Sequence, residues 1–140
     1  MDGDPSTFYH SIDPTNLAWV QIELQNEVLV QHVQITDRIN CCWKRFSNVE
    51  IRVGNENADY SRNRIFVNQF CNIYDGHGTA KKLVIGIDCV KAVSGRYITI
   101  QILDDSVNVM NLAEVDVFGK LKGKLLFSVM QQPVKFHQLK

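Results

Sequence analysis

Long apolar runs, an excess of basic charge and helical periodicity are all absent from this sequence of 140 residues. The 15 lysines and arginines are balanced by 15 acids, so the positive surplus that nucleic-acid binding needs is missing. No apolar window is long enough to span a membrane. The N-terminal residues lack the basic and apolar regions of a signal peptide. We therefore expect a globular domain that neither binds nucleic acid nor inserts into a membrane.

Catalytic motifs are missing as well. The sequence contains no Gly-x-Ser-x-Gly elbow, no phosphate-binding loop and no His-Glu-x-x-His motif. No pair of carboxylates stands out as the acid and base of a glycoside hydrolase. The histidines share no spacing, and they are His10, His32, His77 and His137. These absences predict that the protein is not an enzyme.

Period-two alternation of apolar and polar residues is the dominant pattern that is present. It predicts strands over residues 19–24, 28–37, 49–53, 83–87, 97–103 and 112–118. Turn-like residues separate several of them, among them 25–27 and 54–57, and 57–64 reads as a polar loop. With 45% apolar residues the chain can bury one core. Short strands separated by turns predict an all-β sandwich or barrel.

Charge is unevenly distributed along the chain. Residues 1–119 contain every acid, whereas residues 120–140 contain lysines and no acid. We therefore divide the chain into a domain at 1–119 and a basic C-terminal extension at 120–140, whose role the sequence does not indicate.

Two of the four cysteines are adjacent, at Cys41 and Cys42, and they lie between Arg38 and Arg45. Neighbouring cysteines make a poor metal clamp, and the only ring that they can close on themselves is very small. A small ring flanked by two cations is more plausible as a surface for a small ligand than as a stabilising device. The ligand that we expect is a sugar.

The other two cysteines, Cys71 and Cys89, are left to pair with each other. Such a bridge would contribute about 3 kcal/mol through the entropy of the closed loop. Two alternatives stand beside it: four reduced thiols in a cytosolic protein, or a zinc site that adds His77, whose spacing fits poorly. We favour an oxidised, extracellular protein.

Three separated stretches resemble the F-type (fucose-binding) lectin domain, a jelly-roll relative of the coagulation-factor discoidin modules. They are residues 2–10, residues 33–54 and, taken together, residues 95–100 and 113–119. The middle stretch is the specific one, because strand, arginine, vicinal cysteines, arginine and strand follow in the family's order. The resemblance implies a discoidin-like jelly-roll β-sandwich. It is N-terminally shortened, because Met1 falls within the first motif.

The resemblance implies recognition of L-fucose without chemistry on it. Arg38 and Arg45 occupy the basic positions, and guanidinium groups offer fixed donors to sugar oxygens. A vicinal disulfide would present a flat face to the C–H side of the sugar, and an apolar notch would take its methyl group. The fucose-binding residues implied in this way are Phe8, Tyr9, His10, Arg38, Asn40, Cys41, Cys42 and Arg45.

The chain departs from the family pattern in three places. Asn40 stands where the family has aspartate, and a neutral amide holds the arginines less firmly than a carboxylate. The loop after Tyr9 is short, so His10 matches either the histidine of the Phe-Tyr-His stretch or the sugar-binding histidine beyond it. The family's loop cysteine and its partner are both absent, which leaves no orphan thiol.

Members of the family also carry a structural calcium. The matching positions are Asp2, Asp4, Ser11, the backbone of Ala113 and Glu114. Oxygen ligands of this kind suit calcium. The alternative is that the two aspartates belong to a frayed acidic terminus. The family's first strand is absent too, which would expose a sheet edge, and we expect residues 125–130 to cover it.

We expect a secreted lectin domain that binds fucosylated glycans in innate immune or cell-surface recognition. A shallow monosaccharide site binds weakly, so a homo-oligomer that presents several sites is expected. The alternative is a discoidin-like interaction or structural module that has lost sugar binding. A third reading is a truncated or alternatively spliced fragment.

Overall fold

The computed structural model describes residues 4, 6–11, 18–57, 66–79, 84–103, 109–121 and 135–137. Apart from one turn of 3-10 helix, η1 (Trp43–Arg45), the regular elements of these residues are all strands. They are β1 (Tyr9–His10), β2 (Trp19–Thr36), β3 (Ser47–Gly54), β4 (Gln69–His77), β5 (Val84–Ile102), β6 (Asn111–Leu112), β7 (Glu114–Leu121) and β8 (Lys135–His137). The all-β jelly-roll sandwich that the sequence predicts is confirmed.

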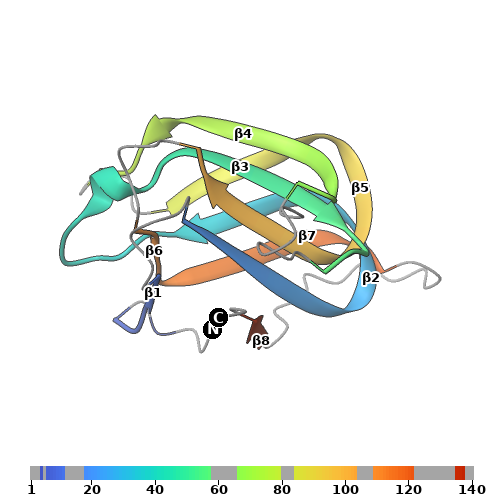
Figure 1. Cartoon of the computed structure of the whole chain (residues 1–140), viewed down its shortest axis with the longest axis horizontal. Helices are drawn as coiled ribbons and strands as arrows, with labels where there is room; N and C mark the ends of the chain where they lie inside the picture. Colours follow the sequence, from blue (N-terminus) through green and yellow to red (C-terminus); the bar gives the residue numbers. More distant parts are fainter. Residues whose placement is uncertain are drawn as a thin grey trace.

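One six-stranded sheet makes up most of the molecule, and every recorded pairing in it is antiparallel. Its order is β4-β3-β5-β2-β7, with β8 also paired to β2, while β1 and β6 form a separate two-stranded sheet. β2 and β5 are 18 and 19 residues long and pair along most of their length. Figure 1 shows β3 and β4 beside one half of this long ribbon and β7 beside the other half.

The long ribbon bends because its register shifts twice. The shifts fall between Glu23 and Val28 and between Val30 and His32, and Gln25 has a φ of 63°. Bulges bend a strand and increase its twist. As a result the β2–β5 ribbon contributes to both layers of the sandwich.

The core lies between the two layers and is built from the alternating residues that the sequence predicts. On β5, Ile98, Ile100 and Ile102 are each 0% exposed. Ile85 on β5 is equally buried, and so are the β2 and β3 residues Ile22, Val33, Ile35, Val49, Ile51 and Val53. Each such side chain contributes roughly 1.5–3 kcal/mol on burial, so this cluster supplies the main driving force for folding.

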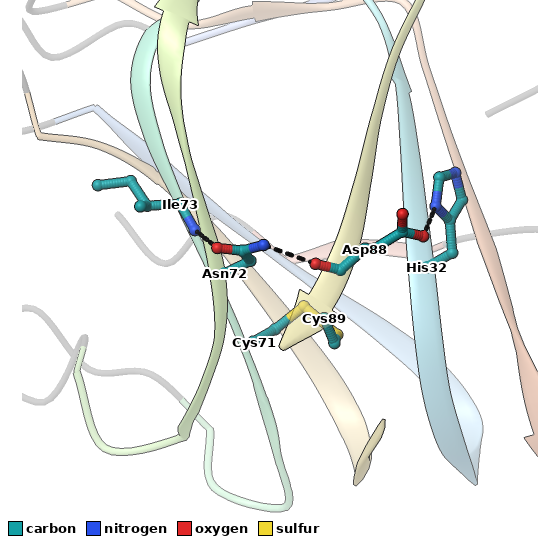
Figure 2. Close-up of a disulfide and its surroundings, with 6 residues drawn as sticks. All are labelled: His32, Cys71, Asn72, Ile73, Asp88 and Cys89. Atoms are coloured by element: carbon teal, nitrogen blue, oxygen red, sulfur yellow. Dashed lines mark hydrogen bonds and ion pairs between the residues drawn. A yellow bond between two sulfur atoms is a disulfide. The ribbon is translucent and has the colours of Figure 1, made fainter. Parts of the chain in front are cut away.

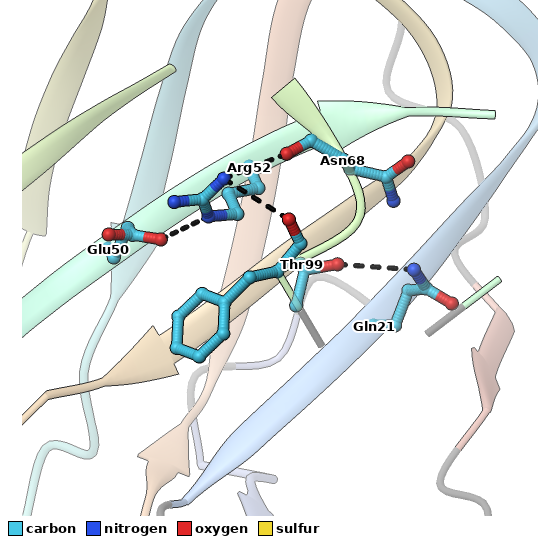
Figure 3. Close-up of polar contacts among 6 residues, drawn as sticks. Gln21, Glu50, Arg52, Asn68 and Thr99 are labelled. Carbon is cyan, nitrogen blue, oxygen red and sulfur yellow. Dashed lines mark hydrogen bonds and ion pairs between the residues drawn. The ribbon is translucent and has the colours of Figure 1, made fainter. Parts of the chain in front are cut away.

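The opposite face of the sheet is polar where β2, β3 and β5 lie together (Figure 3). Gln21 Nε2 donates to Thr99 Oγ1 at 3.1 Å and to the Glu56 carbonyl at 3.2 Å. Arg52 Nη1 donates to the Asn68 carbonyl at 3.0 Å. These bonds attach the chain around residues 55–57 and 66–68 to the outer face of the sheet.

A disulfide between Cys71 on β4 and Cys89 on β5 joins the two layers (Figure 2). Beside it, Asn72 Nδ2 donates to the Asp88 carbonyl, and the His32 ring contacts the Asp88 carboxylate, each at 2.7 Å. Among the described residues β4 pairs with β3, whereas Cys89 lies in the half of β5 that pairs with residues 28–36 of β2. The disulfide therefore connects strands that lie in different layers. The pairing expected from the sequence is present.

Two predictions about the strands are wrong. Residues 25–27 form no turn, because β2 runs through them, and residues 88–96 continue β5 rather than separating two strands. Both segments include a register shift of the β2–β5 pairing, so the strands pass through them as bulges instead of ending in turns. β4 was not predicted, because Cys71 is its only buried residue and no alternation marks it. Of the polar loop expected at 57–64, residues 58–64 lie outside the described residues, and so does Leu83.

The C-terminal part departs from the predicted pattern as well. The strand predicted at 112–118 is divided at Ala113 into β6 and β7, and β7 continues to Leu121. β8 pairs with residues Gln21, Ile22 and Glu23, so it covers that part of the β2 edge. Residues 125–130, which we expected there, lie outside the described residues. No helix in the described part of the chain is long and apolar enough to cross a membrane.

Candidate functional site

The connection between β2 and β3, residues 37–46, carries the vicinal cysteines, and we call it the Arg38 loop. Cys41 and Cys42 form a disulfide. Cys42 adopts a left-handed conformation with φ of 71°, and η1 follows directly. The Arg45 N–H donates to the Cys42 carbonyl at 3.0 Å, and Phe46, 1% exposed, ends the loop in the core. The loop is therefore folded tightly and anchored at its C-terminal end.

The Arg38 side chain is held on two sides. Its guanidinium lies 4.0 Å from the centroid of the Phe8 ring, a cation–π contact. Its Nε donates to Asn40 Oδ1. Within the described residues its two terminal nitrogens have no partner, so they remain available to donate to a ligand. The structure thus brings Phe8, Arg38 and Asn40 together next to the Cys41–Cys42 disulfide.

The base of the Arg38 loop contains a buried carboxyl group. Asp37 is 1% exposed, and its Oδ1 accepts the Arg38 N–H at 2.7 Å. Its Oδ2 has no hydrogen-bond partner among the described residues. Burial raises the pKa of this carboxyl to about 6, and the Arg38 N–H offsets part of the effect.

Gly78, just after β4, closes the base of the loop. Its N–H donates to the Phe46 carbonyl at 2.8 Å. A Cβ at this position would lie 2.4 Å from the Trp43 carbonyl oxygen and 2.7 Å from Asp37 Oδ2, so no larger residue fits without movement. The sequence analysis missed Asp37 and Gly78. The available signal was the closely spaced pair Gly76 and Gly78, since such glycines often mark a close approach of the backbone.

Among the described residues, the others expected to bind the sugar have no recorded contact with the Arg38 side chain or are partly buried. Tyr9 and His10 form β1, which pairs with β6. Tyr9 packs against the core, and burial raises the pKa of its hydroxyl, so Phe8 is the aromatic residue at the surface of this segment. His10 is exposed. Among the described residues neither His10 nor Arg45 has a recorded side-chain contact with Arg38.

Four of the five candidate calcium ligands, Asp4, Ser11, Ala113 and Glu114, lie within the described residues. The Ser11 N–H donates to the Met110 carbonyl at 3.0 Å, and the Ser11 hydroxyl accepts the Met110 N–H at 2.9 Å. The Ala113 N–H donates to the Thr36 carbonyl at 2.8 Å. No group of three His, Cys, Asp or Glu side chains that could hold a metal occurs among the described residues. Asp2 lies outside them. The donor set therefore fits calcium only if backbone carbonyls supply part of the shell, which calcium accepts.

A family model, two relatives and a solved structure are similar to this chain. The model of the family described as "NedA-like, galactose-binding domain" matches residues 1–100. The chain is 31% identical over 119 residues to the pentraxin fusion protein of Xenopus laevis, covering 85% of this chain and 26% of that protein. It is 26% identical over 121 residues to Fucolectin-4 of Anguilla japonica, covering 84% of this chain and 63% of that protein. The chain therefore spans less than two thirds of the length of either relative.

A solved structure is similar over nearly the whole chain. It is a fucolectin from the serum of striped bass, Morone saxatilis. The TM-score is 0.70 at 26% sequence identity, and the alignment covers 88% of this chain and 42% of that one. The similarity extends the match from the sequence to the arrangement of the strands.

Proposed function

We propose that this chain, which belongs to the NedA-like, galactose-binding domain family, recognises terminal L-fucose on glycans. Family membership and the similar lectins support carbohydrate binding by a protein that performs no reaction on the sugar. The finer assignment to fucose rests on one observation. Arg38 is fixed by Phe8 and Asn40 beside the Cys41–Cys42 disulfide, with its terminal nitrogens unoccupied by described residues.

Binding would combine charged hydrogen bonds with an apolar contact. The terminal nitrogens of Arg38 donate to hydroxyl or ring oxygens, and hydrogen bonds to a charged group contribute roughly 1.5–3 kcal/mol. The disulfide and the exposed edge of Phe8 offer a polarizable surface to the C–H face and the methyl group of a 6-deoxy sugar. Arg45 and His10 are the further donors that we assign to this site.

The setting of the site is part of the same proposal. Calcium held by Asp2, Asp4, Ser11, Ala113 and Glu114 would fix the segment that carries Phe8 relative to the Arg38 loop. We propose that the protein acts outside the cell, where its two disulfides persist. A homo-oligomer would raise the strength of weak single sites by presenting several at once, as self/non-self recognition at cell surfaces requires.

Retention of the oxidised protein on immobilised L-fucose tests the proposal. We expect retention, elution by free L-fucose, and weaker retention after treatment with a calcium chelator. The Arg38→Ala variant should flow through with its fold intact. If folded wild-type protein flows through as well, the sugar assignment is wrong, and the chain serves as an interaction module instead.

A further inference from the structure

The Arg38 loop carries three cations, Arg38, Lys44 and Arg45, within eight residues. Lys44 and Arg45 end η1, whose first turn contains no acid. In the described part of the chain none of the three forms an ion pair with a carboxylate. Positive charge is therefore concentrated at the place where a ligand would sit.

The arginines outside the loop are treated differently by the fold. Among the described residues these are Arg52 and Arg96, and each is paired with a carboxylate on a neighbouring part of the sheet. Arg52 pairs with Glu50, and Arg96 pairs with Glu23. The lack of an acidic partner is thus a property of the Arg38 loop rather than of the arginines of this protein in general.

The polar groups closest to Arg38 leave this charge uncompensated. Asn40 accepts the Nε hydrogen bond as a neutral amide, so it orients the guanidinium without cancelling its charge. Asp37 is the one acid within the loop, and it is buried. Its oxygens face the Arg38 backbone N–H and Gly78 rather than the guanidinium group.

We propose that the preferred ligand of this site is an anionic saccharide, one that carries a sulfate or a carboxylate next to the bound sugar ring. The inference rests on the proposed sugar site. Two terminal guanidinium nitrogens match two oxygens of a sulfate or carboxylate, and such charge-assisted pairs are stronger than bonds to neutral hydroxyls. Lys44, which we do not assign to the neutral sugar, adds further favourable charge for an anion.

The test compares neutral and charged sugars on the full chain by chemical-shift titration. L-fucose, a sulfated L-fucose and N-acetylneuraminic acid are titrated separately at about 20 mM and about 500 mM salt. At low salt we expect at least one of the two anionic sugars to bind about 5-fold more tightly than L-fucose, and the advantage to shrink at high salt. The sulfated and carboxylated arms identify which anion the site prefers.

The Asn40→Asp variant adds one negative charge at the Nε of Arg38 and keeps an acceptor there. It should reduce the preference for the anionic sugar, measured as the ratio of its affinity to that for L-fucose, about 3-fold. Lys91→Gln, which removes an exposed cation from β5, is the matched control and should change neither affinity. Equal effects of the two variants would overturn the proposal, because the affinity for the anionic sugar would then depend on the net charge of the protein and not on the charge beside Arg38.

The remaining outcomes separate this inference from the proposed function. L-fucose binding with no preference for an anionic sugar overturns the inference and leaves the fucose assignment standing. Binding of an anionic sugar without binding of L-fucose supports the inference and overturns the fucose assignment. If folded protein binds none of the sugars, or binds inorganic sulfate as tightly as sulfated fucose, the inference is wrong.

Discussion

The two disulfides of this protein differ in nearly every structural respect. Cys71 and Cys89 are 18 residues apart in sequence, and they join β4 to β5 across the two layers of the sandwich. Cys41 and Cys42 are neighbours in a partly exposed loop. A disulfide stabilises mainly by restricting the unfolded chain, and the restriction grows with the length of the closed loop. One disulfide therefore stabilises the fold, whereas the other shapes the surface of the candidate site.

Two arginines repeat the same contrast. Arg52 lies 5.2 Å from the Phe66 ring centroid, and it also binds Glu50 and the Asn68 carbonyl. Arg38 lies 4.0 Å from the Phe8 ring centroid, but its terminal nitrogens have no partner among the described residues. The donors of Arg52 are used to tie a loop to the sheet. The donors of Arg38 are held in position by Phe8 and Asn40, and its terminal nitrogens can donate to a ligand.

The largest effect should come from removing the disulfide between the layers. Replacing Cys71 and Cys89 together by serine should lower the free energy of unfolding by about 3 kcal/mol, because the unfolded chain loses its closed loop. Urea unfolding measures the change. The affinity of the folded fraction for L-fucose should stay the same.

The matched change is the double replacement Cys41→Ser and Cys42→Ser. It should leave the free energy of unfolding within about 0.5 kcal/mol of the wild type while weakening sugar binding. If this variant lost as much stability as the first, the division between a stabilising and a shaping disulfide would be wrong.

The next effect in size is on affinity. Arg38→Ala removes the charged hydrogen bonds that we assign to the sugar and should weaken binding roughly 10- to 150-fold, equivalent to about 1.5–3 kcal/mol. Titration with L-fucose measures the loss, and thermal unfolding should show little change in stability. Arg38→Lys keeps the charge without the fork of donors, and it should restore only part of the affinity. Full affinity in Arg38→Ala would remove Arg38 from the site.

Much of the fold could be predicted from the sequence because buried alternation is a local pattern. Residues 49–53 and 97–103 alternate in sequence, and in the structure 49–53 and 97–102 lie in strands. The bends were not predictable in the same way. Gln25-Asn26-Glu27 has the composition of a turn, but pairing of β2 with β5 keeps it within a bulged strand. Tertiary hydrogen bonding outweighed local preference there.

The candidate site shows a similar limit. The adjacent cysteines and flanking arginines could be recognised from sequence, because their spacing is unusual. The roles of Asp37 and Gly78 depend on β4 ending against the base of the loop, and β4 has no buried alternation to mark it. A site residue contributed by an edge strand is therefore the kind that sequence patterns fail to find.

A smaller effect, on stability alone, should follow from Arg52→Ala. The variant loses the ion pair with Glu50 and the hydrogen bond to the Asn68 carbonyl, so we expect a loss of about 1–2 kcal/mol in the free energy of unfolding. Affinity for L-fucose should not change. A drop in affinity comparable to that of Arg38→Ala would show that the two arginines are not separated in function.

The smallest predicted effect concerns Asp37 and pH. Burial raises the pKa of its carboxyl from 3.8 to about 6, so the folded protein holds this proton more tightly than the unfolded chain does. Stability from this group is fully present below pH 3.8 and is lost as the pH rises through about 6. Without any screening by solvent, a pKa shift of this size would change the free energy of unfolding by ~3 kcal/mol. Asp37 lies in a loop near the surface, where solvent screens the charge, so we expect a change of about 1 kcal/mol.

Asp37→Asn isolates this effect, because the amide keeps an acceptor for the Arg38 N–H but does not titrate in this range. When the pH is raised from about 4.5 to about 7.5, the wild type should lose about 1 kcal/mol more of its free energy of unfolding than the variant does. Contributions from groups that are the same in both proteins cancel in this difference. A difference that stays constant with pH would mean that the Asp37 carboxyl is solvated in the folded protein. The base of the Arg38 loop would then be open to water, unlike the sealed core that the Cys71–Cys89 disulfide holds together.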